Sequence, residues 1–208
     1  MSTGTRINIA DAQRLAAWLF KHWVLDPKTC FVVGSVRRQC DTVGDIEIIA
    51  PRRDKKDDPE FERISATMEG TVLRSMFDAP VAQPIGRAIK GLKPGFLAAY
   101  MELDTRTVGA FPVQIYRYGP DNFGWIMLMR TGPADFGEWF LGRWKDAHGI
   151  SRGDPRFRGS IDGHLVDASC MVVPVRTEDE AFARINVKPV PPERRSAFVE
   201  HIKAGRVA

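Results

Sequence analysis

Residues 29–51 read TCFVVGSVRRQCDTVGDIEIIAP, and this stretch carries most of the chemistry that the sequence offers. Its apolar start, residues 30–33, predicts a short strand, and Gly34 and Ser35 predict a tight turn directly after it. Glycine lets an anion approach the backbone closely, so this turn can offer amide groups and a hydroxyl to a phosphate. The two arginines that follow add permanent positive charge of the kind that binds phosphate.

The second half of the stretch predicts a strand with two carboxylates on one face. Residues i and i+2 of a strand share a face, so Asp45 and Glu47 point the same way. Ile46 and Ile48 then face a core. Mg²⁺ prefers hard oxygen ligands and is commonly bound by one or two carboxylates together with substrate phosphates. The combination predicts phosphoryl or nucleotidyl transfer, whereas the acidic strand taken alone is equally typical of an ordinary edge strand.

Gly34-Ser35, a spacer and then Asp45-x-Glu47 resemble the signature of the polymerase-beta-like nucleotidyltransferases. The pattern Gly-Ser-x-Arg-Arg is similar to that of the family X DNA polymerases within this group. The resemblance covers residues 8–195 and implies an α/β fold of the α+β kind, a polymerase-beta-like palm followed by a C-terminal thumb. It also implies a minimal form without the N-terminal lyase domain, similar to forms found in viruses and phages.

The resemblance further implies roles for individual residues. Asp45 and Glu47 would be catalytic because they would bind Mg²⁺ or Mn²⁺. The run 123–132, FGWIMLMRTG, resembles the family's aromatic helix ending in Thr-Gly, where the turn passes under the sugar and base of the incoming nucleotide. The residues that the resemblance implies for nucleotide binding are Gly34, Ser35, Arg38, Gly44, Thr131 and Gly132.

Gln114 is the largest departure from the family. Its members carry a third carboxylate here, which completes the catalytic metal site and helps to activate the attacking hydroxyl, whereas residues 113–116 of this chain read VQIY. Gln114 therefore stands at a catalytic position, but an amide has no negative charge and cannot act as a base. Simple pairing around the predicted hairpin turn places Met101 opposite it. Glu102 and Asp104, on the neighbouring predicted strand, are alternatives for the missing acid, although neither would then lie opposite Gln114.

The resemblance divides the chain into two predicted domains, and capping signals with apolar spacing predict the individual elements. These are residues 1–120, a nucleotidyltransferase palm with an N-terminal helix, and residues 121–208, a thumb-like C-terminal subdomain. The predicted elements besides the acidic strand are helices over residues 8–24 and 58–76, a hairpin of 97–104 and 111–118, and helices over 133–149 and 177–185.

Composition limits the class of protein without identifying it. The chain has 208 residues, is 44% apolar and carries a net charge of +4, which is typical of a globular protein and only weakly indicative of a nucleic-acid partner. The three widely separated cysteines form neither a disulfide framework nor a zinc spacing. The sequence contains no signal peptide and no apolar run long enough to span a membrane. We expect a soluble, intracellular, cytoplasmic monomer without a membrane partner.

The function implied by the resemblance is that of a polymerase-beta-like DNA polymerase. Such an enzyme transfers a nucleoside monophosphate from a nucleoside triphosphate to a nucleic-acid 3′-hydroxyl, so the expected partners are a nucleoside triphosphate and DNA, with RNA as an alternative. Because of Gln114, a catalytically weak or inactive relative that binds nucleotide or nucleic acid is a second hypothesis. Nucleotidyl transfer to a small molecule or a protein is a third, although small-molecule transferases usually lack a thumb.

Overall fold

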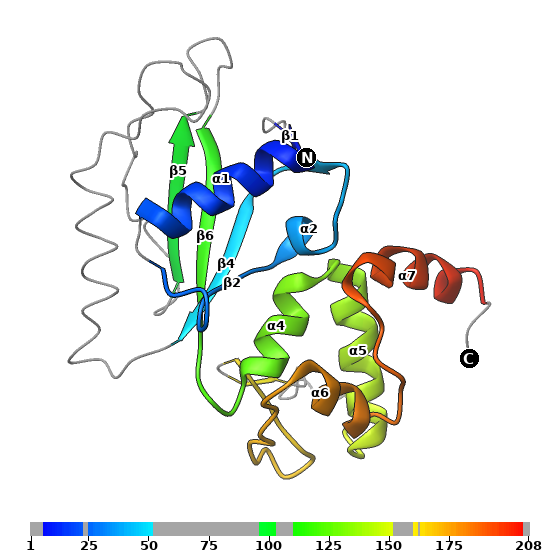
Figure 1. The fold of residues 1–208 in the computed structure, drawn as a ribbon. Coiled ribbons are helices and arrows are strands. Elements are labelled where there is room, and N and C mark those ends of the chain that lie inside the picture. The colour runs from blue at the N-terminus through cyan, green and yellow to red at the C-terminus, as the bar shows by residue number, and fades with distance from the viewer. Residues whose placement is uncertain are drawn as a thin grey trace. The chain divides into compact units, whose positions relative to one another are not determined.

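A four-stranded β-sheet lies at the centre of the first of two units in the computed structural model (Figure 1). The structure describes residues 6–22, 25–51, 96–102, 110–151, 160–161 and 163–205. The chain is mixed α/β, and its two units comprise residues 1–117 and 118–208, where the sequence predicts a boundary after residue 120. The predicted helix over residues 58–76 and the acid Asp104 lie outside the described residues.

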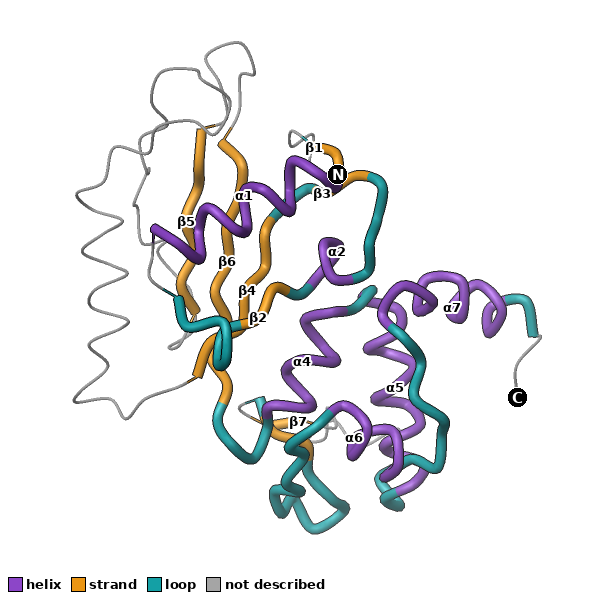
Figure 2. The backbone as a smooth tube through the Cα atoms, in the orientation of Figure 1, coloured by secondary structure: helices purple, strands orange, loops and turns teal. Residues whose placement is uncertain are grey.

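In the first unit, the strand that carries Glu47 is an inner strand, and it begins at Ile46, so Asp45 precedes it instead of lying on it as predicted (Figure 2). The larger sheet has the order β2-β4-β6-β5, and β1 pairs with β3 in a separate small sheet. The interpretation of the acidic strand as an edge strand is therefore wrong. The elements of this unit are β1 (Ile7–Asn8), α1 (Ile9–His22), β2 (Phe31–Val32), α2 (Gly34–Arg37), β3 (Thr42–Val43), β4 (Ile46–Pro51), β5 (Phe96–Glu102) and β6 (Ala110–Tyr118).

Helix α1 lies across one face of the larger sheet (Figure 1). Its start agrees with the prediction, because the Asn8 side-chain oxygen accepts a 2.9 Å hydrogen bond from the backbone N–H of Asp11. The buried side chains that α1 and the sheet share are Ala12, Leu15, Ala16, Leu19, Ile46, Ile48, Ala50, Val113 and Ile115. Alternate residues of β4 and β6 thus point into this core, and the residues between them lie on the opposite face of the sheet.

The hairpin formed by β5 and β6 has a different register from the predicted one. Gln114 pairs with Ala98, whereas Met101 pairs with Phe111. The prediction was wrong because β5 ends at Glu102, two residues earlier than expected, and β6 begins at Ala110, one residue earlier, and the paired strand ends set the register of the hairpin. Glu102 pairs with Ala110, so this acid does not lie opposite Gln114.

The second unit is mainly helical in its described part. Aromatic side chains pack between its helices, and Phe140 and Trp144 are fully buried. The predicted helices over 133–149 and 177–185 correspond to α5 and α6. The elements are α4 (Phe123–Thr131), α5 (Ala134–Ala147), β7 (Ser160–Ile161), β8 (His164–Leu165), α6 (Glu178–Arg184), a 3₁₀ turn (Pro192–Arg194) and α7 (Arg195–Lys203).

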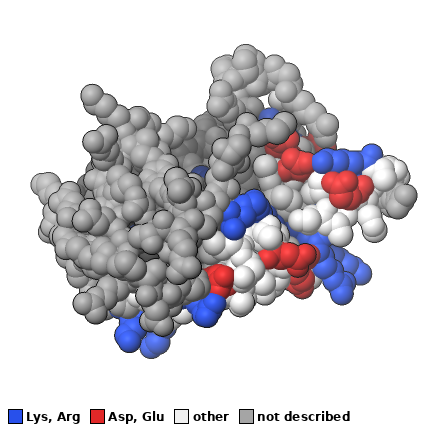
Figure 3. All heavy atoms as spheres, turned by 90° about the horizontal axis from the view of Figure 1, so that it is seen from above, with Lys and Arg blue, Asp and Glu red and all other residues white. Residues whose placement is uncertain are grey.

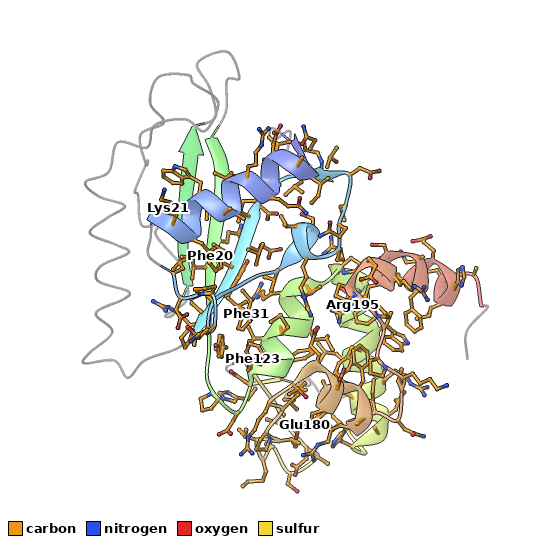
Figure 4. All side chains as sticks on the ribbon, viewed as in Figure 1. Phe20, Lys21, Phe31, Phe123, Glu180 and Arg195 are labelled. Atoms are coloured by element: carbon orange, nitrogen blue, oxygen red, sulfur yellow. The ribbon has the colours of Figure 1, made fainter. Side chains whose placement is uncertain are left out.

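A buried arginine holds the C-terminal part of this unit together (Figure 4). The guanidinium of Arg195 forms a 2.7 Å ion pair with Glu178 and donates a 3.1 Å hydrogen bond to the carbonyl of Val190. It also lies 5.0 Å from the ring centre of Phe136 and 5.8 Å from that of Phe182. One side chain thereby joins α5, α6 and α7 and the segment that precedes the 3₁₀ turn.

Gly124, in the first turn of α4, allows this helix to cross the backbone at the start of α6. A Cβ atom at residue 124 would lie 2.1 Å from the carbonyl oxygen of Thr177 and 2.2 Å from its carbonyl carbon. The backbone N–H of Gly124 donates a 3.0 Å hydrogen bond to Val175. Since the nearby atoms belong to the backbone, a side chain at residue 124 cannot be accommodated by a change of rotamer.

We expect Gly124→Ala to lower the free energy of unfolding of the second unit by about 1–3 kcal/mol or more, because the added methyl group overlaps the Thr177 backbone. The matched control is Gly142→Ala in the middle of α5, where a Cβ would have no neighbour within 4 Å. This control should raise the free energy of unfolding by roughly 0.8–1 kcal/mol through helix propensity. Urea denaturation measures the free energy of unfolding of both variants. Equal effects of the two substitutions would contradict the close approach of α4 to the Thr177 backbone.

Candidate functional site

The Glu47 carboxylate lies directly against the backbone of Gly34. A Cβ atom at residue 34 would be only 2.1 Å from Oε2 of Glu47 and 3.0 Å from its Cδ. The backbone joins the same two segments, because the N–H of Val33 donates a 2.8 Å hydrogen bond to the carbonyl of Glu47. Antiparallel pairing of β2 with β4 continues this contact along the strands. The turn after β2 and the acid on β4 therefore form one local site.

The turn itself differs from the predicted tight turn, because residues 34–37 form the short helix α2. Gly34 has a φ of +66°, a value that side-chain-bearing residues rarely adopt. Oγ of Ser35 is buried and has no hydrogen-bond partner within the described part of the chain. A buried hydroxyl without a partner costs free energy, and an oxygen of a bound anion could supply the missing acceptor.

Two arginines lie near Asp45, and one of them, Arg6, comes from a distant part of the sequence. Arg38 follows α2, and its N–H donates a 3.1 Å hydrogen bond to the carbonyl of Gly34. Arg6, which precedes β1, donates hydrogen bonds from Nε to Oγ1 of Thr42 at 3.0 Å and from Nη2 to the Thr42 carbonyl at 2.7 Å. Its Nη1 would be 3.2 Å from a Cβ atom at Gly44, so the guanidinium lies over this glycine.

Asp45 precedes β4 and is half-buried. Burial raises the pKa of this carboxyl above 3.8, its ordinary value, while the positive charges of Arg38 and then of Arg6 act in the opposite direction. The two arginines therefore do not fully offset the cost of burying the ionised carboxylate. A metal ion close to Asp45 would add the positive charge that the two arginines only partly provide.

Gln114 lies on the same face of the sheet as Glu47. Val113 and Ile115 point into the core beneath α1, as do Ile46 and Ile48 on the adjacent strand, so the residues between them occupy the other face. On that face the hydroxyl of Tyr116 donates a hydrogen bond to Oε1 of Gln114. The position expected for a third carboxylate is thus filled by an amide that is bound to a tyrosine.

Thr131 and Gly132 belong to the second unit and end α4. The Thr131 side chain is fully buried. Gly132 has a φ of +61°, donates a backbone hydrogen bond of 3.1 Å to Leu128 and is joined to Pro133 by a cis peptide bond. Their expected role beside the sugar of a nucleotide stays a prediction.

Sequence reasoning missed Arg6 and Tyr116. Arg6 lies 39 positions before Asp45 (45 − 6), and no local periodicity connects the two residues. Tyr116 could have been found, since it is two residues after Gln114 and therefore shares its face of the strand.

The first unit offers suitable ligands for one Mg²⁺ or Mn²⁺ ion. Asp45 and Glu47 are half-buried oxygen donors beside a buried hydroxyl and two cations, a set that suits a metal ion bound together with phosphate. Across the described residues, no three histidine, cysteine, aspartate or glutamate side chains converge on one point. The protein fits a metal whose remaining ligands come from a substrate.

Comparison with known proteins adds no assignment: no family model and no curated protein matches the chain.

In the part of the chain that the structure describes, no helix is both long and apolar enough to cross a membrane. On the face shown in Figure 3, lysine and arginine side chains of described residues lie beside aspartate and glutamate side chains. Among the described residues of this face, the positive side chains are therefore interspersed with acidic ones.

We expect Asp45→Asn to raise the melting temperature of the metal-free protein at neutral pH. A carboxyl whose pKa is raised on folding destabilises the folded state above that pKa, and this penalty disappears below the ordinary value of 3.8, where the group is protonated in both states. The gain over the wild type should therefore shrink as the pH falls toward 3.8.

Thermal unfolding over a series of pH values tests this expectation. Asp41→Asn, at an exposed acid in the same segment, serves as the control and should not show the pH-dependent gain. A lower melting temperature for Asp45→Asn at neutral pH would mean that the attraction of Arg38 and Arg6 outweighs the effect of burial.

Proposed function

We propose that this protein binds a nucleoside triphosphate with Mg²⁺ or Mn²⁺ and transfers the nucleoside monophosphate to a nucleic-acid 3′-hydroxyl. The observation that carries the proposal is the packing of the Glu47 carboxylate on Gly34, beside the cluster of Asp45, Arg38 and Arg6. Cations alone would suit a free phosphate, and acids alone would suit a free metal ion. Both kinds of group at one place suit a metal–phosphate complex.

Each residue of this cluster has a part in binding. Arg38 and Arg6 would neutralise phosphate oxygens, and the Ser35 hydroxyl would donate a hydrogen bond to one of them. Asp45 and Glu47 would hold the metal ion, which when bound supplies Lewis-acid polarisation of the phosphate. The small size of Gly34 lets the acid and the phosphate approach the same piece of backbone.

In the proposed reaction, the 3′-oxygen of the acceptor forms a bond to the α-phosphorus, and the bond between that phosphorus and pyrophosphate breaks. The acceptor hydroxyl loses its proton to water in this step. The amide of Gln114 cannot take up this proton, so we expect slow transfer. The nucleic-acid acceptor is inferred from the resemblance to the polymerase-beta-like nucleotidyltransferases and from the palm and thumb that this resemblance implies for the two units.

A protein that binds the nucleotide without efficient transfer is the second candidate function. The hydrogen bond from Tyr116 to Gln114 favours it, because this bond holds a neutral amide where the related enzymes carry a base. Both candidates require nucleotide binding by the first unit, and they differ only in the chemical step.

We expect Arg38→Ala to weaken the binding of a nucleoside triphosphate with Mg²⁺ by about 1.5–3 kcal/mol, the usual contribution of a hydrogen bond to a charged group. Isothermal titration calorimetry with each nucleotide measures the effect. The neighbouring Arg37→Ala is the matched control, since Arg38 and not Arg37 is one of the two arginines whose charge acts on Asp45. Absence of binding by the wild type would refute both candidate functions.

We expect Asp45→Ala and Glu47→Ala each to abolish primer extension while leaving the fold intact, because both side chains are only half-buried and neither belongs to the apolar core. Extension of a DNA primer, with and without template, in Mg²⁺ and in Mn²⁺ measures the activity. Asp41→Ala removes an exposed acid from the same segment and should keep wild-type activity. Wild-type extension rates in either acid variant would show that the metal is bound elsewhere.

A further inference from the structure

The side chains of Gln114 and Tyr116 form a pair on β6. They are two residues apart, both are half-buried, and both lie on the face of the sheet opposite Val113 and Ile115. The Tyr116 hydroxyl donates its hydrogen to Oε1 of Gln114. Since β6 is hydrogen-bonded to β4, this pair is on the strand next to the one that carries Glu47, on the same face.

The hydrogen bond determines what Gln114 can offer to a ligand. A carboxamide has one oxygen, which accepts, and one NH₂ group, which only donates. Because Oε1 accepts the hydrogen bond from Tyr116, this bond orients the amide, and Nε2 is the donor that Gln114 holds toward other partners. An N–H donor binds an anionic oxygen and cannot coordinate a cation.

We propose that Tyr116 is a positioning residue, which fixes Gln114 as a hydrogen-bond donor to an anionic oxygen of the metal-bound triphosphate. This inference rests on the proposed nucleotide binding and specifies its chemistry. The site then has a donor where a third carboxylate would otherwise stand, and it holds one divalent metal ion together with the triphosphate.

The charge of the site agrees with a single metal ion. Asp45 and Glu47 are two carboxylates, the number that typically binds one Mg²⁺ together with substrate phosphates. A second cation near Gln114 would meet a neutral amide whose oxygen is already bound to Tyr116. Its positive charge would also be repelled by Arg38 and Arg6, the cations that act on Asp45.

Gln114→Glu is the sharpest test, because it keeps the size of the side chain and replaces the Nε2 donor with a carboxylate oxygen. The probe is Mn²⁺ titrated by electron paramagnetic resonance in the presence of α,β-methylene deoxynucleoside triphosphate, with each base in turn. We expect the wild type to bind about one Mn²⁺ per protein and Gln114→Glu about two, since a carboxylate is a good Mn²⁺ ligand. The analogue does not react, so this measurement is independent of catalytic activity.

A double-mutant cycle tests whether Tyr116 acts through Gln114. Tyr116→Phe alone should weaken binding of the Mn²⁺ analogue complex by about threefold to tenfold, the range for one ordinary hydrogen bond. In a Gln114→Ala background the same substitution should have no effect, whereas a purely structural role would persist there. Tyr118→Phe, which removes a hydroxyl at the end of the same strand, is the control and should leave affinity unchanged.

The outcomes separate this inference from the proposed function. Absence of nucleotide binding in the wild type overturns both. Nucleotide binding with two Mn²⁺ ions in the wild type, or with one in Gln114→Glu, overturns the donor assignment alone. Equal effects of Tyr116→Phe in the wild-type and Gln114→Ala backgrounds overturn the positioning role.

Discussion

The Glu47 carboxylate occupies the space that a side chain at residue 34 would need. This contact requires glycine for two reasons: a Cβ would lie 2.1 Å from Oε2 of Glu47, and the backbone has a φ of +66°. It joins the start of α2 to β4, and the hydrogen bond from Val33 to Glu47 keeps the two segments in register. The remaining groups of the site are positioned with respect to these two segments.

Positive charge reaches the site from both sides of the contact. Arg38 comes from the end of α2, while Arg6 comes from the segment before β1 and is held by Thr42 on β3. Burial nevertheless raises the pKa of Asp45, so the arginines do not fully compensate the desolvation of its carboxylate. This incomplete compensation is the electrostatic reason to place a metal ion and its phosphate ligands there. It would also make the empty site less stable than the occupied one.

The two units depend on different kinds of interaction. In the first, an apolar layer beneath α1 supports a sheet whose other face carries Glu47, Gln114 and Tyr116. In the second, aromatic rings surround the buried guanidinium of Arg195, which is paired with Glu178. A buried arginine of this kind is costly unless its partners are in place, so it constrains the arrangement of the helices around it.

Local patterns in the sequence predicted the features that depend on neighbouring residues. Two-residue alternation predicted that Ile46 and Ile48 are buried while Glu47 between them is not, and the predicted start of a helix at residue 8 agrees with the cap that Asn8 forms on α1. Tertiary structure decided what depends on distant segments: the inner place of β4, the approach of Arg6 and the hairpin register that pairs Gln114 with Ala98. The physical reason is that side-chain periodicity reports which face a residue occupies. Which residues share that face is settled by strand pairing and packing between segments far apart in the chain.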